Sequence, residues 1–243
     1  MLRLFPRTLL VSLLLFAIIS CQKDILPEMV YIPGGEFILG CDSLGDADES
    51  PAHSVFVKPF LIGKYEVTQE EWGLIMKINP SEFKGDQRPV ECVSWDDALL
   101  FITKLNDLTG EKYRLPTEAE WEYVAKCGYD LSATTDSLSY LGWWIDNSDA
   151  ETHEVGLLRP NKFGVYDMIG NVHEWCADLY DSLAYAKSVG AISNDATFQS
   201  NEAVARGGNW ISQKQFTRIS NRNHAPLGYR SPTVGFRLAM DVE

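Results

Sequence analysis

The sequence predicts a single α+β domain with little regular secondary structure, and three observations support this fold class. Of the 243 residues, 45% are hydrophobic and 23% are charged, which is ordinary for a globular protein and excludes a largely disordered chain. Three clear helix-capping motifs all lie in the first half of the chain. After Gly128 the helical periodicity stops, and Gly, Asn, Asp and aromatic residues become frequent. We therefore expect short strands and loops in residues 129–243, ordered by large buried side chains.

The first twenty residues are predicted to be a lipoprotein signal peptide. Two arginines supply a basic start, and residues 9–19 form an apolar run that is too short to span a membrane. The run ends in Ser20-Cys21, which matches the lipobox of bacterial lipoproteins, where the cysteine thiol receives the lipid. The alternative is an ordinary secretory signal with an incidental cysteine. We expect residues 21–28 to be a tether that links acylated Cys21 to a domain at 29–243.

The residues after Cys21 bear on localisation. Gln22-Lys23-Asp24 is similar to a short surface-export signal of lipoproteins in one phylum of Gram-negative bacteria, although a solvated tether explains the same residues almost as well. We therefore expect a lipid-anchored protein at the bacterial outer membrane or cell surface, and the periplasmic face remains open.

The charge and the cysteines limit the partners and cofactors. With 21 basic and 34 acidic residues the net charge is −13, so nucleic acid is not an expected partner. The chain has no CxxC motif, which argues against structural zinc. In an exported protein four cysteines permit two disulfides, in any of three pairings, but they can equally be small buried apolar residues. These four are Cys41, Cys92, Cys127 and Cys176.

The chain after the tether begins with strands. Residues 29–39 read as a strand, a turn at Pro33-Gly34-Gly35 and a second strand. Residues 42–50 are acidic and rich in turn formers, so an exposed loop is predicted there. Residues 54–65 are predicted to form strands at a sheet edge.

Three helices are predicted next. Each begins with a capping motif, in which a Ser or Thr is followed three residues later by an acidic residue. The caps are Thr68, Ser94 and Thr117, and the helices are expected to reach about residues 78, 108 and 126. Gly110 stops the second helix. Its apolar stripe is expected to face the core and consists of Ala98, Phe101, Ile102, Leu105 and Leu108.

Seven segments carry a family resemblance. They are MVYIPGGEF at 29–37, YEVTQ at 65–69, PVECVSWDDA at 89–98, YRLPTEAEWEY at 113–123, NKFGVYDMIGNVHEW at 161–175, RGGNW at 206–210 and GFRL at 235–238. In this order they resemble the formylglycine-generating enzyme family, also called sulfatase-modifying factor. The resemblance spans residues 29–238 and implies an elaborated C-type-lectin-like fold.

Most of these residues are predicted to be scaffold. Arg206 and Arg237 lie in apolar or Gly-rich surroundings, so each is expected to be buried and paired with an acid. Gly207, Gly208 and Gly235 suggest tight turns or close approach of two backbone segments.

The block at 161–175 predicts a calcium site. Asp167 and Glu174 offer carboxylate oxygens, and backbone carbonyls between them can complete an oxygen shell. In the family this block holds calcium, and the resemblance assigns the side chains of Asp167 and Glu174 and the carbonyls of Gly170 and Val172. The alternative is that the two acids cap loops or pair with arginine.

Catalysis is where the chain departs from the family. The resemblance implies a copper ion held by two cysteine thiolates shortly after the block at 206–210. Here those positions fall on Ser212 and on or close to Thr217, and residues 177–243 contain no cysteine. Hydroxyl groups are poor ligands for Cu(I), so the copper chemistry is expected to be missing.

Four side chains are candidates for a substrate cleft. Arg222 stands where the family has a pocket arginine, and Trp175 and Trp210 are expected to line the same cleft. His173 replaces an aromatic residue of the family and is either a pocket group or a hydrogen-bonded structural residue.

Two functions fit these observations. The first is a non-catalytic scaffold or binding lipoprotein, a pseudoenzyme that takes a peptide, a glycan or a protein partner in its cleft. The second is a formylglycine-generating oxidase that acts on cysteine in exported sulfatases. The missing cysteine pair favours the first.

Overall fold

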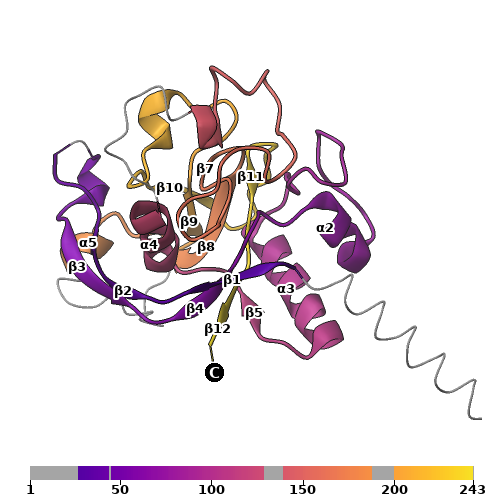
Figure 1. Cartoon of the computed structure of the whole chain (residues 1–243), viewed down its shortest axis with the longest axis horizontal. Coiled ribbons are helices and arrows are strands. Elements are labelled where there is room, and N and C mark those ends of the chain that lie inside the picture. The colour runs from indigo at the N-terminus through magenta and orange to yellow at the C-terminus, as the bar shows by residue number, and fades with distance from the viewer. Residues whose placement is uncertain (1–26, 44, 129–138, 188–199, 243) are drawn as a thin grey trace, which may run out of the picture.

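The first and last strands of the domain belong to one four-stranded sheet (Figure 1). In the computed structural model, which describes residues 27–43, 45–128, 139–187 and 200–242, the order is β1 (Met29–Ile32), β4 (Phe60–Gly63), β12 (Ala239–Asp241) and β5 (Tyr113–Arg114). The predicted signal peptide and Cys21 lie outside the described residues. The C-terminal strand β12 pairs along the second side of β4, so the prediction of edge strands is wrong for β4.

A two-stranded ribbon extends from this sheet. β2 (Gly35–Leu39) pairs with β3 (His53–Val57), so the two predicted strands of residues 29–39 join different partners. The predicted acidic loop contains a 3₁₀ turn, Ala47–Glu49. Glu49 is buried there and accepts hydrogen bonds from Arg218 at 2.8 Å. The prediction that this loop is exposed is therefore wrong for Glu49.

The three predicted helices are confirmed as α2 (Gln69–Met76), α3 (Trp95–Thr109) and α4 (Glu118–Gly128). Each is preceded by the expected cap, and each cap exchanges hydrogen bonds with the acid three residues later. α2 ends before residue 78 because Lys77 adopts a φ of 68°. α3 ends at Gly110, whose left-handed conformation was the expected stop.

The second half contains short elements, as predicted. Strands β10, β9, β8 and β11 form a second sheet in that order, and β6 pairs with β7. Their bounds are β6 (Gly142–Trp143), β7 (Ile169–Gly170), β8 (His173–Leu179), β9 (Glu202–Arg206), β10 (Asn223–Pro226) and β11 (Val234–Gly235). Helical elements in the described part of this half include α5 (Ala184–Lys187) and the 3₁₀ helix η3 (Lys214–Thr217).

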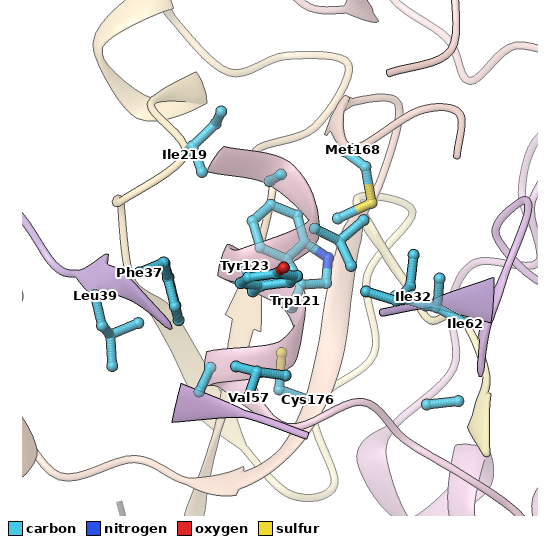
Figure 2. Packing of buried hydrophobic residues seen from close by; sticks show 14 of the residues in the cluster. Ile32, Phe37, Leu39, Val57, Ile62, Trp121, Tyr123, Met168, Cys176 and Ile219 are labelled. Atoms are coloured by element: carbon cyan, nitrogen blue, oxygen red, sulfur yellow. The ribbon is translucent and has the colours of Figure 1, made fainter. Parts of the chain in front are cut away.

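Buried side chains fill two regions. Around α4, Trp121 and Tyr123 pack against Phe37 and other residues of the sheets (Figure 2). Around α2 and α3, Phe101 lies 5.4 Å from the ring of Trp72 and 5.5 Å from the ring of Phe236. The α3 stripe is buried as predicted except for Leu108, which is 56% exposed.

The described part of the chain bears on disulfides and membrane spans. All four of its cysteines are free thiols, so the disulfide option does not occur there. Cys176 is fully buried, as the apolar alternative expects, whereas Cys127 is exposed. No helix of the described residues has the length and apolar character that crossing a bilayer requires.

Candidate functional site

The loop after β9 is held against the predicted calcium loop. Gly207 and Gly208 have φ values of 98° and 76°, which confirms the tight turn expected of them. Gly170 N–H donates to the carbonyl of Gly207 at 2.8 Å, and Trp210 N–H donates to the carbonyl of Asn171 at 3.0 Å. The two segments singled out by sequence therefore meet in one place.

Arg206 anchors this loop in the core, as predicted. Its guanidinium is fully buried and contacts Glu118 at 2.6 Å and Glu122. Burial alone would raise the pKa of Glu118, but the guanidinium groups of Arg222 and Arg206 outweigh burial and hold it below its usual range. One carboxylate thus holds two arginines, and all of these groups are scaffold.

Two of the four cleft candidates belong to this scaffold. Arg222 donates to both oxygens of Glu118, at 2.7 and 3.0 Å, and lies 4.4 Å from the ring of Tyr185. Trp175 is fully buried and donates from Nε1 to the carbonyl of Val93 at 3.0 Å. The structure therefore places both side chains in the interior of the domain.

The other two candidates differ from each other in exposure. His173 is 7% exposed, and its Nε2 lies 2.9 Å from the amide nitrogen of Asn223. Burial lowers the pKa of His173 to about 4, so its ring is neutral near pH 7. Trp210 is half-buried; it donates to the carbonyl of Pro232 at 2.8 Å, and its ring meets Phe83 edge-on at 5.2 Å.

Ser212 and Thr217 stand where the family's thiolates were expected, and both hydroxyls stabilise the loop. The Ser212 hydroxyl accepts from Asn209 N–H at 3.0 Å, and the Thr217 hydroxyl donates to the carbonyl of Lys214 at 2.9 Å. Both residues are nearly buried. Across the described ranges, no three His, Cys, Asp or Glu side chains gather closely enough to hold a metal ion.

Exposed apolar side chains surround this loop, and sequence reasoning missed them. Ile145, Ile211 and Phe216 are 46–49% exposed, and Ile145 N–H donates to the carbonyl of Ser212 at 3.2 Å, which joins the two segments. Single apolar residues in loops have no periodicity, so no sequence signal distinguishes them from core residues. We call these three residues and Trp210 the loop surface.

In the predicted calcium loop, Asp167 is buried and one of its carboxylate oxygens lacks a hydrogen-bond partner. Its backbone φ is 55°, and Oδ2 accepts from Gly156 N–H at 2.7 Å, whereas Oδ1 has no hydrogen-bond partner. Both oxygens of Glu174 lie 2.5 Å from Arg237, and Oε2 also accepts from Trp121 at 2.7 Å. The alternative that an acid of this loop pairs with arginine therefore holds for Glu174.

Glu66 is a third buried carboxylate that the sequence did not reveal. It accepts from the Asn171 side chain at 2.7 Å and is 1% exposed. Burial and the charges of Asp167 and Glu174 raise its pKa well above the usual range, and burial raises the pKa of Asp167 to about 6. Three buried carboxylates thus face one guanidinium, that of Arg237. The free Oδ1 of Asp167 is available to a cation such as calcium, whereas both oxygens of Glu174 already accept from Arg237.

Comparison with known proteins relates the whole domain to one family. The model of a family described as "Sulfatase-modifying factor enzyme 1-like domain" matches residues 16–242. The solved structure of PvdO from Pseudomonas aeruginosa is 30% identical, with a TM-score of 0.80, and the match covers 91% of this chain and 97% of that one.

Relatives with different names share this domain. "Chaperone protein LppX" of Paenibacillus barcinonensis is 29% identical, over 90% of this chain and 91% of its own. "Inactive C-alpha-formylglycine-generating enzyme 2" of Mus musculus is 25% identical, over 96% and 93%. "Serine/threonine-protein kinase pkn1" of Chlamydia caviae is 32% identical over 91% of this chain, which covers only 39% of that relative.

Proposed function

This chain belongs to the sulfatase-modifying factor family, and we propose that it is a non-catalytic, lipid-anchored binding protein built on the family fold. The observation that carries the proposal is the replacement of the two thiolate positions by Ser212 and Thr217, whose hydroxyls are both used inside the loop. No cysteine follows residue 176 that could take their place. Without two soft ligands the loop lacks what Cu(I) requires.

Two relatives support a role without catalysis. One is named an inactive member of the enzyme group and the other a chaperone, and both align with about nine tenths or more of this chain. A chaperone binds a polypeptide without changing its bonds, and the loop surface offers exposed apolar side chains for such a contact. A peptide or protein partner therefore fits the loop surface better than a glycan.

Export and lipid attachment complete the proposal. The basic start, the short apolar run and Cys21 support a lipoprotein at the outer membrane or cell surface. An acylated Cys21 would hold the domain at a membrane without any spanning helix.

The first test is for the oxidase activity. The protein is incubated with copper, reductant, oxygen and a cysteine-containing sulfatase peptide, and the peptide is analysed by mass spectrometry. We expect the cysteine to remain unchanged, because hydroxyl ligands do not hold Cu(I). An active formylglycine-generating enzyme serves as the positive control. Formylglycine above the level without protein would instead establish the oxidase.

The second test concerns calcium, which we propose binds at Asp167, at Glu174 and at the carbonyls of Gly170 and Val172. Calcium at about 100 times its Kd would add about 2.7 kcal/mol to the unfolding free energy. Chelation should therefore lower the melting temperature of the wild type. Asp167→Asn keeps an acceptor for Gly156 but removes the charge, so its melting temperature should not respond to the chelator.

The exposed Asp146→Ala variant is the control for the calcium test, and it should respond as the wild type does. If calcium and chelator give the same melting temperature in the wild type, calcium does not bind, and the free oxygen of Asp167 needs another explanation.

A further inference from the structure

The described chain begins beside an apolar hollow between α2 and α3. The hollow is shallow and encloses no space that a water molecule could fill. It is lined by Pro27, Glu71, Ile75, Phe101, Leu105 and Leu238. Leu74 and Leu108 follow Glu71 and Leu105 by three residues on their helices, so each lies next to a residue that lines the hollow. These leucines are 52% and 56% exposed.

Two more exposed apolar side chains belong to the same helices. Ile78, directly after α2, is 79% exposed, and Leu100 on α3 is 47% exposed. Leu100 and Leu108 are two helical turns apart and share a face. We call the four residues Leu74, Ile78, Leu100 and Leu108 the α2–α3 end. Figure 1 shows α2 and α3 together at the side of the molecule where the described chain begins.

The tether limits how far this end can be from the lipid. Six residue steps separate Cys21 from Pro27, and a fully extended chain covers about 3.4 Å per residue, so the reach is about 20 Å. That length is similar to the radius of a domain of this size, so a domain tethered at Pro27 must keep its tethered end close to the bilayer.

We propose that the α2–α3 end rests on the bilayer that carries the anchor, with its four apolar side chains in the headgroup region. The inference rests on the proposed acylation of Cys21. The loop surface, which lies on neither α2 nor α3, then stays accessible to a partner.

The contact is apolar rather than electrostatic. Exposed charges of both signs lie near the four residues, namely Glu70, Lys77, Lys104 and Asp107. An anionic bilayer would therefore attract this end only weakly by electrostatics, and added salt should not weaken the contact. A short tether raises the effective concentration of the domain at the bilayer to the millimolar range. A contact between the α2–α3 end and the bilayer that is too weak to hold the free domain is then strong enough to orient the anchored one. Release of a Cys21→Ala variant is therefore compatible with the proposal.

The experiment uses the acylated full chain in phosphatidylcholine vesicles that contain a quencher-labelled lipid. A fluorescent amino acid is placed at Ile78 in one sample and at Phe216, an exposed residue of the loop surface, in the other. We expect lipid quenching at position 78 to exceed that at position 216 by about threefold or more, as for a residue at the interface. The ratio should be unchanged between about 50 and 500 mM salt.

A substitution and the anchor variant complete the design. Leu108→Glu should reduce quenching at position 78, whereas Tyr229→Glu, a control at an exposed aromatic residue, should not. Equal quenching at 78 and 216 would overturn the proposed orientation, and so would quenching that salt abolishes. Retention of Cys21→Ala in the membrane fraction of cells would instead overturn the anchor, so the two failures are distinguishable.

Discussion

Replacing Glu118 by glutamine should lower the unfolding free energy by about 3–5 kcal/mol, because it removes the carboxylate that two buried guanidinium groups share. Arg206 and Arg222 both bind this carboxylate, and their side chains are 0% and 1% exposed. Uncompensated buried charge is far more costly than the loss of a surface pair. Denaturant unfolding monitored by tryptophan fluorescence measures the change.

Glu120→Gln is the matched control for Glu118→Gln, on the same helix. Glu120 pairs with Arg114, whose side chain is 29% exposed, so the expected loss is only about 1 kcal/mol. The pKa of Glu118 is lowered, so its stabilising effect is present above its unfolded pKa and is lost as the pH falls through its folded pKa. The difference between wild type and Glu118→Gln should therefore shrink in acid. Equal losses in the two variants at pH 7 would contradict the buried cluster.

Gly170→Ala should prevent stable folding or lower the unfolding free energy by more than about 4 kcal/mol. A methyl group at this position would lie 1.8 Å from the carbonyl oxygen of Trp143, on the paired strand β6. Gly170 also has a φ of 78°, which side chains rarely tolerate. The clash is with backbone, so the β6–β7 pair would have to separate.

Gly164→Ala is the control that separates the steric clash at Gly170 from the cost of its positive φ. Its φ is 85°, yet nothing lies within 4 Å of the added methyl, so it reports backbone conformation alone. We expect it to cost about 1 kcal/mol. Thermal unfolding followed by circular dichroism compares both variants. If the melting temperatures of the two fall equally, the close approach of β6 and β7 is not as described.

Local chemistry made the helices predictable, and pairing over long distances made the sheets unpredictable. The caps at Thr68, Ser94 and Thr117 act within four residues, so the sequence contains the complete signal. The partner of β4 on its second side comes from the other end of the chain, and no pattern within residues 54–65 indicates it.

The site was predictable to the extent that its residues have distinctive chemistry. The burial of Arg206 and Arg237 followed from the cost of an unpaired guanidinium. Glu66 was missed because its role depends on a partner more than 50 residues away. Phe216 was missed because its exposure depends on the absence of neighbours around it. Trp175 shows the same limit, since sequence does not reveal which face of a short strand points inward.

The position of β12 makes completion of the first sheet a late event in synthesis. Its three residues, Ala239–Asp241, lie between β4 and β5, so the sheet that begins at β1 is incomplete until this distant segment joins it. A nascent chain lacks that strand until residues 239–241 have been synthesised. Deleting residues 239–241 would therefore open the middle of this sheet and expose the facing edges of β4 and β5, instead of trimming the surface of the domain.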